Sequence, residues 1–365
     1  MKNTFGNSVA VTLFGESHGP YIGAVLDGLA PGIPIDHSYI AHMLTLRRPA
    51  GKISTARQEQ DPYRIVSGVV NGKTTGTPLT ILIPNENVQS GDYAQMKTLA
   101  RPSHADYTAD CKYHGFQESR GGGHFSGRIT AALVAAGAIC KQALEQKGIF
   151  MGTHVKKCAG VSDRDFGDLS ADIRTLNEKT FAVLEAARGE EMQQAILSAA
   201  SEGDSVGGIL ETAIVGVPAG VGEPWFDTME GWLAHMLFSI PAVKGVEFGA
   251  GFGIADMRGS QANDPMRMEN GKVIATSNRS GGINGGITGG MPIIFRTAIK
   301  PTPTIFKPQE TVDFRARTDG VLEPKGRHDP AIVHRARVVQ DAAAAIVLCD
   351  ALALRYGTDW LRGES

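Results

Sequence analysis

A glycine-rich segment, Arg120–Arg128, has the residues of an anion-binding loop. It reads Arg-Gly-Gly-Gly-His-Phe-Ser-Gly-Arg and leads directly into an apolar, helical pattern. Backbone amides of a glycine loop at a helix N-terminus can bind an anion without net positive charge. Ser126 can donate a hydrogen bond, and Arg128 can hold a phosphate or carboxylate through two nitrogens. The segment therefore predicts a site for an anionic group.

Two histidines lie in predicted turns and could transfer protons. His18 belongs to the Gly-Glu-Ser-His-Gly turn at residues 15–19, and His104 follows Arg101-Pro102-Ser103. Histidine is the side chain best suited to accept or donate a proton near neutral pH. Ser17 is not expected to be a nucleophile activated by His18, because adjacent side chains on a strand point to opposite faces.

Two segments near the C-terminus add hydroxyls, cations and a carboxylate. Residues 300–305 read Lys-Pro-Thr-Pro-Thr-Ile, which predicts a rigid extended segment. Residues 326–330 read Gly-Arg-His-Asp-Pro, and the proline disfavours a helix at Asp329. Asp329 is thus a carboxylate beside Arg327 in a turn, where it could accept a proton.

Five arginines accompany these turns. Any one of them, taken alone, fits an exposed surface position. Because each lies near glycine or proline turn chemistry, we interpret the set as part of a site for a highly anionic small molecule. The five are Arg47, Arg48, Arg101, Arg128 and Arg327.

Other phosphate-binding classes fit these motifs less well. The glycine segment lacks the Gly-Lys-Ser/Thr of a P-loop, and it is not a Gly-x-Gly-x-x-Gly turn after a strand. No cluster of Asp and His has metal-ligand spacing, so no metal is expected. Two alternatives stay open: another sugar-phosphate enzyme, such as a kinase or isomerase, and a non-enzymatic carrier of a flavin or metabolite.

The bulk composition is that of an ordinary globular protein. The chain has 365 residues, of which 42% are hydrophobic and 20% charged, and its net charge is −2. No basic field exists to bind nucleic acid or an anionic membrane. The four cysteines form no C-x-x-C pair, and neither a signal peptide nor a membrane span is apparent, so a cytoplasmic protein is expected. The 45 glycines cluster in turns.

The apolar patterns predict the elements that position these turns. Strands are expected at 9–13 and 21–26, and at 65–70 and 79–83 around an Asn71-Gly72 hairpin turn. A helix is expected over 34–46 with Asp36 as N-cap. Two further helices, at 129–148 and 338–356, are apolar on every side and should be buried. Together they predict a helical interior between sheets, whereas the polar stretch 156–202 has no chemistry that we can interpret.

An internal similarity predicts two similar halves, at about 1–150 and 200–355, within one domain. Glycines and serine at 15, 17, 19, 28 and 32 recur 188 positions later, from Gly203 to Gly220. Arg120-x-Gly-Gly is also echoed at Arg279. An ancient duplication would explain the similarity, and so would chance alignment in a glycine-rich chain.

The motifs, in this order, closely resemble the chorismate synthase family. Gly-Glu-Ser-His-Gly with the following Asp27-Gly28 and Pro31-Gly32 resembles its N-terminal signature. Residues 123–128 resemble the central signature, and Arg327-His328-Asp329-Pro330 the C-terminal one. The resemblance extends from Thr4 to about Leu354.

The resemblance implies an α/β sandwich with long helices between antiparallel-rich sheets, assembled as a homotetramer. It implies an anti 1,4-elimination of phosphate and a proton from 5-enolpyruvylshikimate 3-phosphate to give chorismate, the last common step towards the aromatic amino acids. Reduced FMN would be required without net redox change. NADPH would serve only to reduce the flavin, and an external flavin reductase is the expected source of electrons.

The resemblance also implies roles for particular residues. His18 would donate a proton, His104 would stabilise the reduced flavin, and Asp329 would remove the substrate proton through the flavin, with Ser17 and Ser126 assisting. Arg47, Arg48, Arg101 and Arg128 would hold the substrate. The flavin would contact His124, Phe125, Ser126, Pro241, Ala242, Gly285, Lys300, Pro301, Thr302, Pro303, Thr304 and Arg327.

The chain departs from the family pattern in the flavin loop. Most members have Arg-Ser-Ser-Ala-Arg where this chain has His-Phe-Ser-Gly-Arg at 124–128, so an arginine is missing there. Lys52 stands near a usual arginine, and Ala331 replaces a common cysteine. None of these changes removes a predicted proton-transfer residue.

Overall fold

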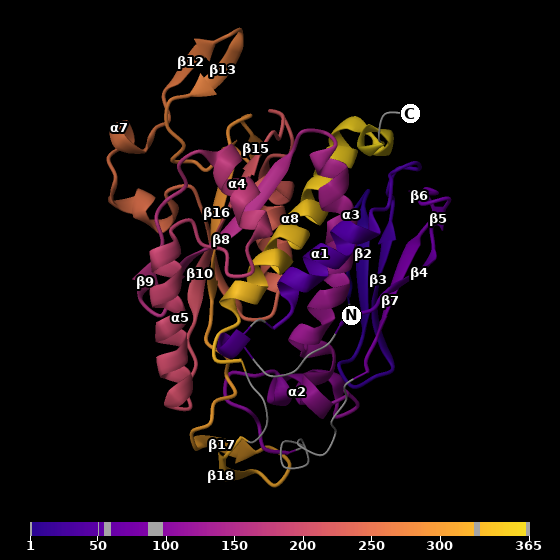
Figure 1. The fold of residues 1–365 in the computed structure, drawn as a ribbon, viewed down its shortest axis with the longest axis vertical. Coiled ribbons are helices and arrows are strands. Elements are labelled where there is room, and N and C mark those ends of the chain that lie inside the picture. The colour runs from indigo at the N-terminus through magenta and orange to yellow at the C-terminus, as the bar shows by residue number, and fades with distance from the viewer. Residues whose placement is uncertain (1, 50, 55–59, 87–97, 325–328, 363–365) are drawn as a thin grey trace.

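Two long helices, α3 (Thr130–Glu145) and α8 (Val333–Tyr356), form the centre of the molecule (Figure 1). The computed structural model describes residues 2–49, 51–54, 60–86, 98–324 and 329–362. Most side chains of both helices are buried, as expected for helices that lack a polar face. The predicted helical interior is confirmed, and α8 begins five residues before its predicted start.

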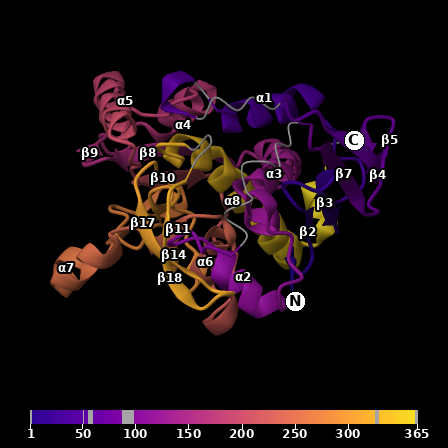
Figure 2. The ribbon, with the colours of Figure 1, turned by 90° about the horizontal axis from the view of Figure 1, so that it is seen from below.

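A five-stranded antiparallel sheet covers each side of this helix pair, as Figures 1 and 2 show. The first sheet has the order β1 (Thr4–Phe5), β2 (Ala10–Gly15), β3 (Tyr21–Asp27), β7 (Leu79–Pro84) and β4 (Arg64–Ser67). The second has the order β11 (Val243–Phe248), β16 (Ile293–Ile299), β10 (Gly208–Val215), β8 (Phe150–Cys158) and β9 (Val161–Ser162). The predicted α/β sandwich is therefore confirmed.

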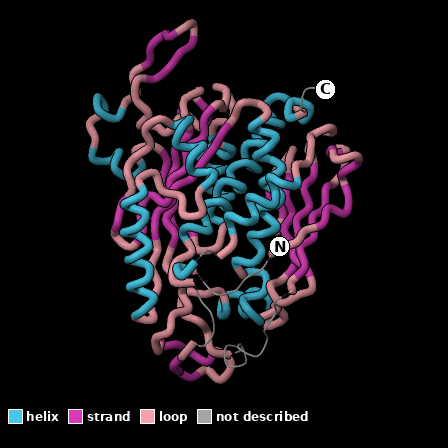
Figure 3. Tube along the Cα trace, viewed as in Figure 1, coloured by secondary structure: helices cyan, strands magenta, loops and turns pink. Residues whose placement is uncertain are grey.

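Shorter elements surround the sandwich (Figure 3). The helices are α1 (His37–Arg47), α2 (Asp106–Tyr113), α4 (Leu169–Glu178), α5 (Ala186–Ser201), α6 (Met229–Ser239) and α7 (Gly259–Ala262). Two-stranded ladders are β5 (Val69–Val70) with β6 (Lys73–Thr74), β12 (Met266–Glu269) with β13 (Lys272–Ala275), β14 (Ile283–Asn284) with β15 (Ile287–Thr288), and β17 (Gln309–Asp313) with β18 (Thr318–Leu322). Among the helices described, none is both long and apolar enough to cross a membrane.

The local signals for α1 and for the first hairpin are confirmed. The Asp36 carboxylate accepts the backbone N–H groups of Ser38 and Tyr39 at 2.8 and 3.1 Å, which satisfies amides that the helix itself leaves unpaired. Asn71 and Gly72 both have positive φ, 50° and 72°, as a two-residue hairpin turn requires. The turn joins β5 to β6, a small extension beyond the paired strands β4 and β7.

Polar side chains of α8 attach this apolar helix to both sheets. Asp350 accepts the backbone N–H groups of Asn7, Ser8 and Val9, ahead of β2, at 2.7 to 2.9 Å. On the side of the second sheet, Thr153 of β8 donates to the Asp341 carboxylate at 2.5 Å. Asp350, Asp341 and Thr153 are buried, so these hydrogen bonds fix the position of α8 along its axis relative to each sheet.

The two sheets pair corresponding strands in the same antiparallel way. In the first sheet Ala10 lies opposite Asp27; in the second, Phe150 lies opposite Val215. β3 and β10 are the central strands of their sheets. Each is followed by a turn braced by a threonine: the Ile33 N–H donates to Thr74 Oγ1 at 2.9 Å, and the Val221 N–H to Thr288 Oγ1 at 3.0 Å.

The division into two similar halves stays a prediction, and the order of elements is consistent with it. Each half runs strand, strand, helix, strand, long helix: β2, β3, α1, β7, α3 and then β8, β10, α6, β16, α8. The polar stretch 156–202, which lies between the two predicted halves, forms the end of β8, β9, α4 and α5. Gly122 follows β7 whereas Gly281 precedes β16, so Arg120 and Arg279 hold different places in the order of elements.

We expect Gly137→Ala to lower the free energy of unfolding. A β-carbon at Gly137 of α3 would lie 2.4 Å from Ala342 Cβ and 2.6 Å from its Cα, so the two central helices would have to separate. Overpacking of this kind costs about 1–3 kcal/mol, which outweighs the ~1 kcal/mol that alanine gains in a helix.

The measurement is urea denaturation of both proteins, with Gly259→Ala of α7 as the control, because nothing lies within 4 Å of a β-carbon there. Equal stability of wild type and Gly137→Ala would contradict the close approach of α3 and α8.

Candidate functional site

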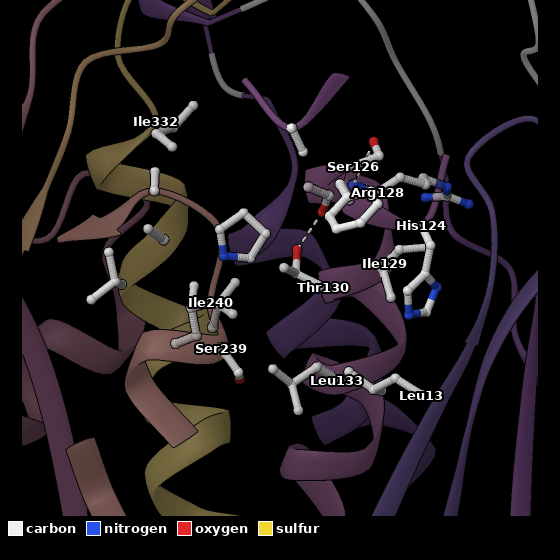
Figure 4. A pocket seen from close by; sticks show the side chains of 18 of the residues that line it. Leu13, His124, Ser126, Arg128, Ile129, Thr130, Leu133, Ser239, Ile240 and Ile332 are labelled. Carbon is white, nitrogen blue, oxygen red and sulfur yellow. Dashed lines mark hydrogen bonds between the residues drawn. The ribbon is translucent and has the colours of Figure 1, made fainter. Parts of the chain in front are cut away.

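A cavity of about 930 Å³ lies at the N-terminal ends of α3 and α8 (Figure 4). Its lining comes from the start of the chain, the glycine segment, the loop after α6, residues 300–304 and the first turns of both central helices. The predicted site residues that line it are Arg47, His104, His124, Phe125, Ser126, Arg128, Pro241, Ala242, Lys300, Thr302, Pro303, Thr304 and Asp329. Ser17, His18, Arg48, Arg101, Gly285 and Pro301 do not line it, and Arg327 lies outside the described residues.

The glycine segment packs between the two predicted proton-transfer histidines. Gly121, Gly122 and Gly123 all have positive φ, which glycine tolerates without strain. A β-carbon at Gly121 would lie 2.1 Å from His18 Cε1, and one at Gly122 would lie 3.3 Å from His104 Cε1. Glycine is therefore required at 121, because the His18 ring occupies the space of a side chain. His18 and His104 lie on either side of one loop at the edge of the cavity.

Ser17 and His18 are in contact, contrary to the sequence-based expectation. Ser17 Oγ lies 3.2 Å from His18 Nδ1 and also donates to the carbonyl of Arg120 at 3.4 Å. The expectation of opposite faces assumed a strand, but β2 ends at Gly15 and these two residues lie in the turn that follows. Ser17 thereby connects the His18 ring to the glycine segment.

Ser126 and His124 have structural partners at the entrance to α3. The Ser126 hydroxyl accepts the Arg128 N–H at 3.2 Å and caps the turn before α3. His124 Nδ1 lies 2.7 Å from the carbonyl oxygen of Gly15, so this nitrogen carries the proton of that hydrogen bond. His124, which differs from the family pattern, thus connects the glycine segment to the end of β2 by a hydrogen bond.

Asp61 is the main residue that sequence reasoning missed. Its carboxylate accepts from Arg47 Nη1 at 3.3 Å through one oxygen and from Arg128 Nη1 through the other. The two arginines are only 5% and 6% exposed, so they need this negative charge to be stable inside the protein. Asp61 precedes Pro62, as Asp329 precedes Pro330, and this repeated turn signal could have identified it.

Both guanidinium groups are held in place by further contacts. Arg47 donates to Thr130 Oγ1 at 2.9 Å and to the carbonyl of Gly127 at 2.8 Å. Arg128 donates to Asn85 Oδ1 at 3.0 Å. Arg48, by contrast, turns away from the cavity and donates to the carbonyl of Gln60. Two preorganised arginines therefore face the cavity at the start of α3.

Asp106 positions His104 and binds Arg101. Arg101 donates to its two oxygens through Nε at 2.8 Å and Nη2 at 2.6 Å, and His104 Nδ1 lies 3.0 Å from Oδ1. Burial tends to raise the pKa of Asp106, but these hydrogen bonds outweigh it and hold the pKa well below its usual range. Arg101 thus contacts Asp106 rather than the cavity, and the other edge of the His104 ring faces Gly122.

Asp329 lines the cavity beside a second residue that the sequence did not single out. Arg335, in the first turn of α8, donates to Asp329 Oδ2 at 2.6 Å and to the carbonyl of Arg47 at 2.9 Å. Arg335 therefore links the predicted proton acceptor to the backbone of Arg47.

The wall formed by residues 240–243 and 300–304 is less charged. Ala242 has φ 76°, unusual for a residue other than glycine, and its carbonyl accepts the Lys300 N–H at 2.9 Å. Burial, with a smaller contribution from Lys244, lowers the pKa of Lys300, whose Nζ donates to the carbonyl of Ser103. Thr302 Oγ1 is buried and has no hydrogen-bond partner among the described residues.

We expect Asp61→Asn to destabilise the fold strongly. The change would leave two buried guanidinium groups without their shared carboxylate, and breaking such a buried pair costs about 3–5 kcal/mol. Urea denaturation at pH 7 measures the loss, with the exposed Asp319→Asn as a matched control. A loss no greater than that of the control would mean that Asp61 does not stabilise Arg47 and Arg128.

Comparison with known proteins shows the family of this chain. The chorismate synthase family model matches residues 9–353. The chorismate synthase of Pyrococcus abyssi is 45% identical over 350 residues, covering 96% of this chain and 97% of the relative. That of Aeropyrum pernix is 43% identical over 374 residues, covering 100% and 98%. A crystal structure of chorismate synthase superposes with a TM-score of 0.73 at 28% identity, covering 97% of this chain and 94% of the other. The chain therefore belongs to the chorismate synthase family.

Proposed function

We propose that the large cavity is the active site where this carbon–oxygen lyase eliminates phosphate and a proton from 5-enolpyruvylshikimate 3-phosphate to give chorismate. The observation that supports this assignment is one cavity bordered by an arginine pair, a carboxylate and a histidine from four separate segments. A carrier without catalytic activity would have no need of a buried arginine pair and an aspartate in one cavity. Membership of the family disfavours the other sugar-phosphate enzymes considered above.

The residues of the less charged wall fit a flavin. A buried hydroxyl without a partner, Thr302 Oγ1, indicates a hydrogen-bonding ligand at this wall. Pro241, Ala242 and Ile240 supply an apolar surface for a planar ring, and Lys300 supplies a cation. These residues, with His124 to Ser126 and Thr304, would hold reduced FMN. When bound, reduced FMN supplies an electron-rich ring that assists loss of the phosphate and is recovered reduced.

The charged groups divide the remaining tasks. Arg47 and Arg128 would hold the phosphate and carboxylates of the substrate, and the negative charge of the departing phosphate would develop beside them. Arg48 and Arg101 stay predictions as direct ligands, and Arg101 would act through Asp106. Asp329, held in position by Arg335, would accept the proton that leaves carbon.

The histidines complete the proton path. Asp106 fixes the orientation of His104, so its outer ring edge would stabilise charge beside the glycine segment. His18, in contact with Ser17, would donate a proton on the other side of the same loop. Ser126 would assist from the start of α3. The glycine segment packs against both histidines and leads to Ser126. We infer that the conformation of this segment is required for turnover.

The assembly and the supply of electrons follow from the family alone. We propose a homotetramer in the cytoplasm that receives reduced flavin from an external reductase, with NADPH used only for flavin reduction. Exposed apolar side chains on the β12–β13 ladder, Met266, Met268 and Val273, are available for subunit contacts. Light scattering after gel filtration measures the assembly, and addition of NADPH with oxidised FMN tests whether the chain reduces flavin itself.

We expect Asp329→Asn to keep flavin affinity and to lower kcat at least 100-fold, because proton transfer by a positioned side chain contributes about 10²–10⁴ in rate. The assay is anaerobic turnover with 5-enolpyruvylshikimate 3-phosphate and chemically reduced FMN. Chorismate is followed by ultraviolet absorbance and phosphate is measured in parallel.

The exposed Asp359→Asn serves as control and should match wild type. Wild type should release equal amounts of chorismate and phosphate while the flavin stays reduced. Near wild-type turnover of Asp329→Asn would remove Asp329 from the mechanism, and absence of product with wild type would reject the proposed reaction.

A further inference from the structure

A second cavity, of about 510 Å³, lies between α1 and α4, beside the C-terminal half of α3 (compare Figure 2). None of its lining residues lines the large cavity. Lys141 of α3 borders it, whereas Thr130, at the start of the same helix, borders the large cavity. At 1.5 Å per residue these positions are about 16 Å apart along the helix, so the two cavities are separate sites.

Lys141 brings a buried ammonium group to this second cavity. The residue is 1% exposed, and its Nζ lies 3.5 Å from Glu145 Oε1. That carboxylate oxygen also accepts a hydrogen bond from the Tyr39 hydroxyl at 2.8 Å. Burial, followed by the charge of Glu145, raises the pKa of Tyr39, so its hydroxyl keeps its proton. An ammonium group carries three donors, and a distant, shared carboxylate leaves it able to bind an anion.

Asn177 of α4 contributes a buried acceptor to the same cavity. Its Nδ2 donates to the carbonyl of Met151 at 3.1 Å, which fixes the orientation of the side-chain amide. Its Oδ1 is buried and has no hydrogen-bond partner among the described residues. An unpaired buried acceptor costs free energy unless a ligand or water donates to it. Asn177 therefore requires an N–H or O–H donor from within the cavity.

The remaining lining carries charges of both signs and an apolar wall. Glu145 and Glu178 are carboxylates, and Arg174 is an exposed cation at the rim. Phe150 and Ile173 provide apolar surface. A simple anion would be repelled by the carboxylates and a simple cation by the lysine and arginine, whereas a zwitterion with an apolar body matches all of these groups.

We propose that this cavity binds an α-amino acid with an apolar side chain. The carboxylate of the ligand would lie on Lys141 and Arg174. Its ammonium group would donate to Asn177 Oδ1 and to a glutamate. The side chain would pack against Phe150 and Ile173, and the cavity is large enough for an aromatic ring.

Isothermal titration calorimetry with L-phenylalanine tests the proposal on the full chain. We expect a dissociation constant below about 1 mM, as is ordinary for a ligand of this size held by two charged groups. 3-Phenylpropanoate lacks the ammonium group and phenethylamine lacks the carboxylate, so each should bind at least about tenfold more weakly. Equal affinity for all three compounds, or no heat from L-phenylalanine up to about 10 mM, would overturn the proposal.

Two variants locate the binding, and each has a matched control. Lys141→Met and Arg174→Ala should weaken L-phenylalanine binding about tenfold and threefold, whereas Lys157→Met at an exposed site and Arg188→Ala at a half-buried one, both outside the cavity, should not. Arg174 lies on the surface, so its variant keeps the test valid if Lys141→Met does not fold. Unchanged affinity in Arg174→Ala, or displacement of L-phenylalanine by FMN, would place the ligand elsewhere and reject the site.

Discussion

The packing of α3 against α8 is the constraint on which the rest of the architecture depends. The helix backbones approach so closely at Gly137 and Ala342 that no β-carbon fits at Gly137. Because neither helix has a polar face, both must be covered, and a sheet covers each side. The N-terminal ends of the helices cannot be covered in the same way, and the large cavity lies there. The position of the large cavity therefore depends on how the two helices are buried as well as on the residues that line it.

Carboxylates hold the cations of the site in position. Asp61 joins Arg47 to Arg128, Asp106 joins Arg101 to His104, and Asp329 is joined to Arg335. Each pair fixes side chains that would otherwise lose considerable rotamer entropy on binding a ligand. The cavity is thus preorganised for an anionic substrate, and its cations do not have to be gathered when the substrate arrives.

The sequence predicted the parts of this site that depend on local chemistry. Glycines 121–123, the two histidine turns and the apolar helices produce signals within a few neighbouring residues; the structure packs the glycines against both histidines and buries the helices. Asp61, Asp106 and Arg335 were missed as partners because an ion pair leaves no periodic pattern: Asp61 is 67 positions from Arg128. The contact between Ser17 and His18 was not predicted, because the sequence does not show clearly that β2 ends at Gly15. The end of the strand decides where these two side chains point. Arg101 illustrates the same limit, since its neighbour Asp106 determines whether it reaches a ligand.

The matched halves of the chain bear on the origin of the central helix pair. α3 and α8 follow corresponding strands, β7 and β16, and each ends its half. If the halves descend from one duplicated gene, the ancestral protein was half as long, and its sheet covered only one face of its last helix. Two identical copies would then have met along that helix in a symmetric dimer, because a self-complementary surface buries itself most simply across a twofold axis. The glycine and alanine contact at the centre would be the remnant of that subunit interface, now enclosed within one chain.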